Sequence, residues 1–179
     1  MTKIGLFVFI LTLVSCNERQ EWVRYESPDK DFELLFPQPP KEQSQLMNSD
    51  FGPIQINMVV YEPQNNELEE NIVYGLAFMD YPKDFLPLNQ TEKIDSFFKV
   101  SIQNSIYNVH GILISEKIIN LKKFPGREIR VSFNEGKGVI NSRFYLIRNR
   151  MIMLQVITDQ RNDFNKSISE FLDSFKLTE

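Results

Sequence analysis

The spacing of hydrophobic and polar residues predicts several strands, a helix, four further strands and a second helix. Short runs with extended character lie at residues 22–25, 32–36, 54–61 and 72–81, and a more polar run at residues 41–48 has the composition of an edge strand. Segments rich in proline and aspartate separate these runs, as expected of turns. The run at 72–81 is almost wholly apolar, which indicates a strand that is buried on both faces.

Two segments change to the three- and four-residue spacing of an amphipathic helix. In the first, we expect Asn89 or Thr91 to cap the beginning and Gly111 to adopt a left-handed conformation at the end. In the second, Thr158 or Asp159 is available as the cap. The apolar residues of the first helix are Ile94, Phe97, Phe98, Ile102, Ile106 and Val109, and those of the second are Phe164, Ile168, Phe171, Leu172 and Phe175.

Between the two helices, four short runs predict a meander of antiparallel strands, with Phe124-Pro125-Gly126 as its first turn. The runs lie at residues 112–121, 127–133, 139–148 and 151–158. Alternation should place their side chains on two faces. We expect one face to pack on a helix through Ile112, Ile114, Ile118, Ile129, Val131, Phe133, Ile140, Phe144, Leu146, Ile152, Leu154 and Val156. The other face would carry Ser115, Lys117, Glu128, Arg130, Ser132, Asn141, Arg143, Tyr145, Met151, Met153 and Gln155.

The first 16 residues have the pattern of a secretory signal. Lys3 precedes an apolar run at residues 4–14, which is too short to span a membrane, since that requires about 20 residues. The run ends in Ser15-Cys16, which resembles the lipobox of bacterial lipoproteins and implies that Cys16 is acylated and residues 1–15 are removed. An ordinary signal peptide with an incidental cysteine is the alternative. Cys16 is the only cysteine and cannot form an internal disulfide, which favours acylation.

This interpretation predicts how the chain is organised and where it is located. Residues 16–21 would be the lipidated cysteine and a polar tether, and residues 22–179 a single domain. Acyl chains on Cys16 would attach the domain to a membrane of the bacterial cell envelope. By the same resemblance, Asn17 in place of an aspartate favours the outer membrane, with the domain outside the cytoplasm and facing the periplasm.

Charge is unevenly distributed along a chain whose net charge is −4. Residues 16–116 contain 17 acidic and 7 basic side chains, whereas residues 117–161 contain 3 acidic and 10 basic ones. The basic segment could form a binding surface, or it could lie beside acidic strands that neutralise it. The overall acidity and the expected location argue against a nucleic-acid partner.

Candidate chemistry is sparse. His110 is the only histidine, so a zinc site is not expected, and it is interpreted as a residue that ends a helix. Motifs for a serine nucleophile, a phosphate loop or a cofactor are not apparent, so we predict neither enzymatic activity nor a cofactor. The expected polar face of the meander provides the candidate binding residues, which are Lys117, Arg130, Asn141, Arg143, Tyr145 and Gln155.

Several short motifs resemble PsbP-like domains over about residues 22–177. They are Ser27-Pro28-Asp29 with Phe32, Phe36-Pro37 and Pro40, then Phe124-Pro125-Gly126-Arg127-Glu128, Arg143-Phe144-Tyr145-Leu146-Ile147, and Phe171-Leu172-Asp173-Ser174-Phe175. The resemblance implies an α+β fold, in which an antiparallel β-sheet is flanked by helices in an α/β/α sandwich. It also implies an accessory protein similar to uncharacterised bacterial lipoproteins.

The sequence therefore leads to one main functional hypothesis and two alternatives. The main hypothesis is a non-catalytic, lipid-anchored envelope module that binds another envelope protein through the Arg130–Arg143–Tyr145 face. One alternative is a carrier that holds a small apolar or anionic ligand in a closed cavity between sheet and helix. A hydrolase that uses a pair of carboxylates is the other, although no pair among the 24 acidic residues stands out.

Overall fold

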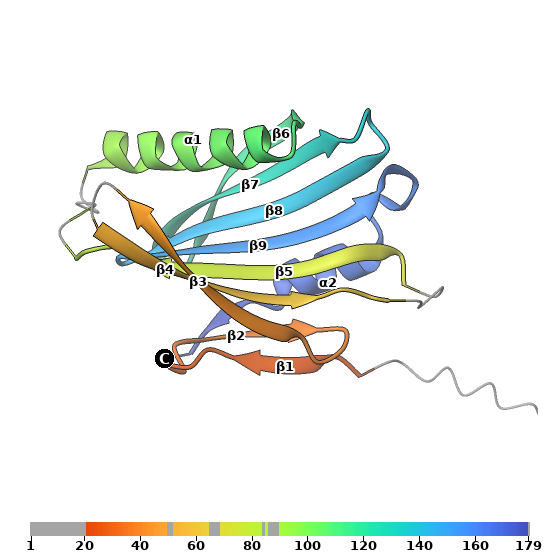
Figure 1. Cartoon of the computed structure of the whole chain (residues 1–179), viewed down its shortest axis with the longest axis horizontal. Coiled ribbons are helices and arrows are strands. Elements are labelled where there is room, and N and C mark those ends of the chain that lie inside the picture. The colour runs from red at the N-terminus through yellow and green to blue at the C-terminus, as the bar shows by residue number, and fades with distance from the viewer. Residues whose placement is uncertain (1–20, 50–51, 65–68, 84, 86–89, 179) are drawn as a thin grey trace, which may run out of the picture.

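Antiparallel sheet dominates the computed structural model, which describes residues 21–49, 52–64, 69–83, 85 and 90–178 (Figure 1). A seven-stranded sheet has the order β3-β4-β5-β9-β8-β7-β6, and a three-stranded sheet has the order β1-β2-β10. The large sheet contains β3 (Lys41–Ser49), β4 (Gly52–Tyr61), β5 (Asn71–Asp80), β6 (Ile112–Leu121), β7 (Phe124–Phe133), β8 (Gly138–Ile147) and β9 (Arg150–Asp159). The small sheet contains β1 (Val23–Glu26), β2 (Phe32–Phe36) and β10 (Lys176–Leu177).

The large sheet is covered on both faces (Figure 1). Helix α1 (Thr91–Asn108) packs on one face through Ile94, Phe98 and Ile102. The small sheet and helix α2 (Lys166–Asp173) cover the other face, together with the short 3-10 helix η1 (Gln160–Asn162) that precedes α2. The fold is thus α+β, with an antiparallel sheet between two outer layers, but one of these layers is partly sheet rather than wholly helical.

Aromatic side chains fill the core between the two sheets and α2. Phe32 of β2 contacts Phe78 of β5 at 5.3 Å between ring centroids and Phe175 at 5.5 Å. Phe171 of α2 lies 5.1 Å from Phe36 and 5.3 Å from Tyr74 in the same way. The contact between Phe32 and Phe175 is tilted and the other three are edge-on. Edge-on ring contacts at these distances are favourable beyond the apolar area that they bury. The N-terminal, central and C-terminal parts of the chain therefore share one core.

Most predicted elements are confirmed, including the strands at residues 32–36 and 112–121 with the bounds that were expected. β3 lies at the edge of the large sheet, as its polar sequence predicted. The caps were predicted less well. α2 begins later than expected and is capped by Asn165, whose side chain accepts a hydrogen bond from the Ile168 N–H, while Asp159 caps η1 instead. Thr91 is the first residue of α1, and Asn89 lies outside the described residues.

The predicted turn at Phe124-Pro125-Gly126 is wrong, because these residues already belong to β7. The chain instead reverses at residues 122–123, between β6 and β7, where Lys122 adopts a φ of 54°. Gly126 is required for a different reason: a Cβ atom there would lie 2.6 Å from the Phe144 carbonyl oxygen and 2.7 Å from the Tyr145 ring. Gly126 is therefore needed for the close packing of β7 against β8 and not for a turn.

The end of α1 differs from its prediction in a similar way. His110, with a φ of 49°, adopts the left-handed conformation that was assigned to Gly111. A Cβ atom on Gly111 would lie 2.5 Å from Cγ1 of Val131 in β7. Gly111 therefore allows the chain to pass close to the sheet as it enters β6.

We predict that Gly126→Ala destabilises the domain by about 2–3 kcal/mol, because the added methyl group meets backbone that cannot move without disturbing β8. Gly75→Ala is the matched control, since its new Cβ would have only the Gln155 carbonyl oxygen within 4 Å, at 3.9 Å. The control should change the free energy of unfolding by less than about 1 kcal/mol. Urea denaturation measures the free energy of unfolding of both variants. Equal losses of stability would contradict this explanation of why glycine is required at position 126.

Candidate functional site

The structure brings five of the six candidate binding residues to one face of the large sheet. Lys117, Glu128, Arg143 and Leu154 are neighbours in register across β6, β7, β8 and β9, and Arg130 pairs with Asn141 in the next row. Tyr145 lies on the same face of β8, one row beyond Arg143. This is the face that α2 and the small sheet cover.

Gln155 is the exception, because it points to the opposite face, where its side chain donates to the Ser142 hydroxyl at 3.5 Å. The predicted parity of β9 was wrong throughout. Ile152, Leu154 and Val156 pack beneath the small sheet and α2, whereas Met151 packs beneath α1. Apolar residues occupy both faces of this strand, so alternation alone could not show which set faces which layer.

Arg143 is fully engaged within the domain. Its Nε donates to Glu128 at 2.7 Å, and its Nη1 donates to Asp173 at 2.6 Å and to the carbonyl oxygen of Leu172 at 3.0 Å. Burial lowers the pKa of Arg143, but the hydrogen bonds that it donates to Glu128 and Asp173 outweigh burial and raise the pKa overall. The side chain therefore fastens the C-terminal end of α2 to the sheet.

Arg130 does the same for the segment before α2. It pairs with Asp163, which also accepts a hydrogen bond from the Asn141 amide at 3.4 Å. The guanidinium carbon of Arg130 lies 4.0 Å from the centroid of the Phe164 ring, a cation–π contact that covers the arginine. The backbone of Phe164 adopts a left-handed conformation there, with a φ of 69°.

Tyr145 and Lys117 differ sharply in exposure. Tyr145 is buried, stacks on Phe175 at 5.7 Å, and has a pKa raised by burial although the charge of Arg143 opposes this. The Lys117 side chain is 69% exposed and lies 3.7 Å from Glu128. The expected recognition face is thus mainly an internal contact with α2, and only Lys117 at its margin is freely available.

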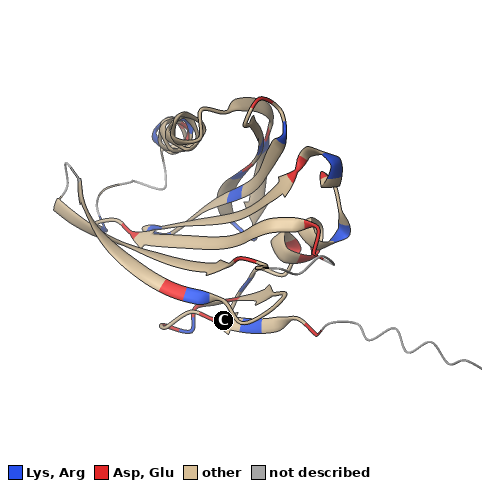
Figure 2. Cartoon of the chain, turned by 45° about the vertical axis from the view of Figure 1, so that its right-hand side comes forward, with Lys and Arg blue, Asp and Glu red and all other residues tan. Residues whose placement is uncertain are grey.

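The uneven charge is largely neutralised between distant segments. Arg150 bridges Asp29 at 3.0 Å, Asp31 at 2.8 Å and Asp80 at 2.7 Å. Arg127 pairs in the same way with Asp95 of α1 and Glu116 of β6. Figure 2 shows that acidic and basic segments are intermixed over the molecule. These pairs support the interpretation that acidic and basic strands lie side by side.

A buried polar network was missed in the sequence. The Tyr74 hydroxyl donates to Glu69 at 2.6 Å and accepts from the Asn71 amide at 2.7 Å. Asn71 and Asn165 exchange amide hydrogen bonds of 2.7 and 3.2 Å. Burial and Glu69 raise the pKa of Tyr74, which keeps the phenol neutral. The network positions the N-cap of α2. No motif around Tyr74 in the sequence indicates that its hydroxyl is part of such a network.

Edge strand β6 exposes apolar side chains. Ile112 and Ile118 are 74% and 75% exposed, and Leu113 and Ile114 are also exposed. The prediction that Ile112, Ile114 and Ile118 pack on a helix is therefore wrong. The register shifts between Leu113 and Ser115, and α1 packs farther inward on β7 and β8. This strand has the most accessible apolar sequence of the described sheet residues.

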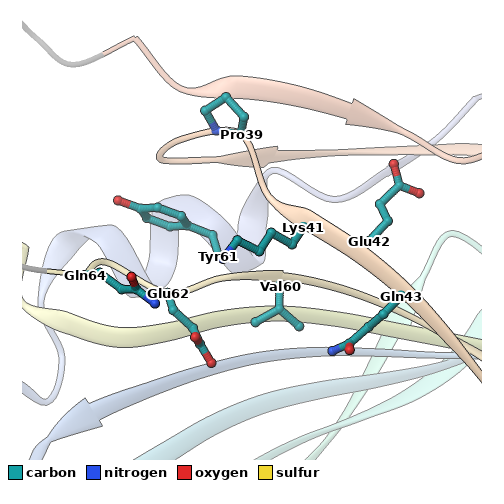
Figure 3. Close-up of a pocket in the computed structure, with 8 residues that line it drawn as sticks. All are labelled: Pro39, Lys41, Glu42, Gln43, Val60, Tyr61, Glu62 and Gln64. Carbon is teal, nitrogen blue, oxygen red and sulfur yellow. The ribbon is translucent and has the colours of Figure 1, made fainter.

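A hollow of about 610 Å³ lies where the chain passes from β2 into β3 (Figure 3). Its lining comes from Pro39, the first residues of β3, the end of β4 and the residues that follow β4. The side chains are mostly polar, as Lys41, Gln43 and Glu62 illustrate in Figure 3. This position differs from the closed apolar cavity between sheet and helix that a carrier would require.

Comparisons with known proteins identify the fold. The structure is similar to the solution structure of cyanobacterial PsbP (CyanoP) from Synechocystis sp. PCC 6803, with a TM-score of 0.56 and 16% identity over 93% of this chain and 99% of that chain. A protein of unknown function from Pseudomonas aeruginosa, PA94, described as a putative regulator, matches with a TM-score of 0.40 and 11% identity over 76% of this chain and 82% of that one. No family model and no curated protein sequence matches this chain.

At this level of identity the first likeness establishes a PsbP-like fold and nothing about activity. Within the described part of the chain, no cluster of three or more histidine, cysteine, aspartate or glutamate residues is arranged to hold a metal ion. Among those same residues, no helix has the length and apolar character needed to cross a bilayer.

We predict that Arg143→Ala lowers the free energy of unfolding by about 2 kcal/mol, since it removes the donor to the Leu172 carbonyl and to Asp173 and leaves Glu128 with only the longer contact to Lys117. Lys117→Ala, on the same face but exposed, should change it by less than about 0.5 kcal/mol. Chemical denaturation gives both values. An Arg143→Ala protein as stable as the Lys117→Ala protein would show that the arginine does not fasten α2.

Proposed function

We propose that this chain is a non-catalytic, lipid-anchored module of the bacterial cell envelope that docks another envelope protein along edge strand β6. The proposal keeps the class of function that the sequence predicted and changes the surface. The arginines of the expected face are paired within the domain, so they cannot also bind a partner without releasing α2. The observation that carries the new surface is the exposure of apolar residues along β6.

Strand β6 has the features of a docking edge. It pairs only with β7 among the described strands, so one row of its backbone N–H and C=O groups is left without a sheet partner. Edges of this kind are usually shortened or protected by charges, because they accept strands from other chains. β6 is ten residues long, and its charged residues Glu116 and Lys117 lie, with Ser115, between the apolar segments 112–114 and 118–119.

The occupant that fits this edge is an extended segment of a partner protein. Such a segment would add to the sheet through main-chain hydrogen bonds, and apolar side chains on both of its faces would cover Ile112 and Ile118. Tyr107, in the last turn of α1 just before β6, is 75% exposed and could contribute to the same contact. A salt bridge to Lys117 or Glu116 would set the register.

We expect Cys16→Ser to abolish labelling of the protein with radioactive palmitate and to release it from membranes into the soluble fraction. The acyl chains would be the attachment, and two or more are needed for stable anchoring. Ser15→Ala is the control, since it keeps a small residue before Cys16 and should leave both labelling and membrane association unchanged. A Cys16→Ser protein that stays in membranes would contradict the lipid anchor.

We expect Ile112→Lys combined with Ile118→Lys to reduce cross-linking to an envelope partner at least tenfold, because the new charges must be desolvated on docking. Ile72→Lys, at an exposed isoleucine of β5, is the matched control and should have no effect. Cross-linking in intact cells followed by purification of the acylated protein measures capture. If the variant with both lysine substitutions in β6 and the Ile72→Lys variant captured the partner equally, a foreign partner on this edge would be excluded. A purified protein that dimerises through β6 would exclude it as well.

A further inference from the structure

We propose that four methionines around Ala77, on the same face of the large sheet as α1, bind a single Cu(I) ion. The proposal concerns a different surface from the β6 edge and does not depend on the docking function. It rests on the strand register, on the open space beside Ala77 and on the chemistry of the thioether group.

The strand register gathers these methionines on three neighbouring strands. Met58 of β4 and Met153 of β9 both lie directly opposite Ala77 of β5, one on each side. Met79 follows Ala77 by two residues on β5, and Met151 of β9 lies opposite Met79. Directly opposite residues share a face of a sheet, and so do residues two apart on one strand. All four methionine side chains therefore leave the sheet on the same side as Ala77.

The four methionines differ in how deeply they lie. Met151 is only 3% exposed and belongs to the core beneath α1. Met79 and Met153 pack against that core and are half-buried, and Met58 is half-buried as well. Met151 would thus be the inner ligand, and the other three can be reached from solvent.

The spacing of the strands allows the four sulfur atoms to converge. Cβ atoms of directly opposite residues lie about 5 Å apart and those of diagonal neighbours at most about 8 Å, so every methionine starts within that range of Ala77. A methionine side chain is unbranched and has three rotatable bonds, so its sulfur can turn toward Ala77 while the backbone stays in place. The alanine methyl group is too short to fill the centre of the ring.

The structure leaves space beside this ring. Gly75 precedes Ala77 by two residues and lies on the same face of β5. A Cβ atom built on Gly75 would have only the Gln155 carbonyl oxygen within 4 Å, at 3.9 Å. Protein cores are close-packed and rarely leave such room. The two small residues therefore leave an approach to the methionines between β4 and β9.

The chemistry of the ligands selects the ion. Thioether sulfur is soft and uncharged, and soft ligands favour Cu(I), whereas calcium and magnesium take oxygen ligands. The outer neighbours of the four methionines in register are all uncharged: Gln43, Ile56, Phe144 and Leu146. A monovalent soft cation can enter such surroundings at a lower cost of desolvation than a divalent one.

Packing alone is the competing explanation of the methionines. It accounts for Met151, but Met58 belongs to neither of the two cores. The Tyr81 hydroxyl donates to the Met79 sulfur at 3.5 Å. This weak contact occupies one lone pair of the sulfur and leaves the other free for a metal ion. The exposure of Met58 and the space beside Gly75 favour a site.

The test uses the full chain with Cys16→Ser, so that no thiol competes for the metal. The protein is titrated without oxygen against the Cu(I) complex of bicinchoninate, whose visible absorption falls as Cu(I) is transferred. We expect one Cu(I) per chain and, at the copper absorption edge, scattering from sulfur ligands. Because a thioether has no proton to lose, the affinity should be equal at about pH 6 and about pH 8 once the protonation of the chelator is accounted for.

Met79→Leu combined with Met153→Leu should weaken Cu(I) binding at least about tenfold, because two of the four ligands are lost. Leucine has nearly the volume of methionine, so the melting temperature should stay within about 5 °C. Met47→Leu, on edge strand β3 and outside the ring, is the matched control and should leave the affinity unchanged.

Three results would each overturn the proposal. The first is that no Cu(I) passes from bicinchoninate to the protein. The second is an unchanged affinity in the double variant, which would show that the methionines only fill the core. The third is a copper absorption edge dominated by nitrogen or oxygen ligands, which would place the bound ion elsewhere on the chain.

Discussion

Both faces of the large sheet are apolar at its centre, and the rest of the structure follows from the need to cover them. On β8, Tyr145 and Ile147 point to one core while Phe144 and Leu146 point to the other. Exposing either face of such a strand to water costs the free energy of burying its apolar side chains. A strand with one solvated face has that cost on its other face alone. Helix α1 is long enough to cover one face, but α2 has only eight residues and cannot cover the other alone. The small sheet supplies the remaining cover.

The second cover is assembled from the two ends of the described chain. β10 pairs with β2, and the Leu35 N–H donates to the Ser174 hydroxyl at 3.0 Å. Arginines of the large sheet then hold this layer in place: Arg143 binds the end of α2 and Arg150 binds the turn between β1 and β2. Arginine suits this role because its planar group can serve several carboxylates at once and keeps its charge when partly buried. The basic segment of the sequence is therefore mainly structural.

The sequence predicted the elements well because each depends on local spacing. It could not predict which layer each face of β9 would meet, because Ile152 and Met151 are both apolar and only the tertiary register separates them. Nor could it pair Arg130 with Asp163 or Arg143 with Asp173, since those carboxylates lie about 30 residues away and belong to a segment whose position depends on its own packing. Because these pairings could not be predicted, the polar face of the meander was interpreted as a recognition surface although it lies inside the domain. The free apolar edge of β6 was missed because its isoleucines were assigned to the core.

Covering both faces leaves a sheet protein with its edges and the seams between its layers as places to bind. β6 is the far edge of the large sheet, and one row of its backbone groups has no strand beside it among the described residues. Its exposed isoleucines stay accessible after both faces of the sheet are covered, because they belong to neither of the two cores. The apolar sequence of an edge strand therefore need not belong to the core, and at β6 it is available to a partner.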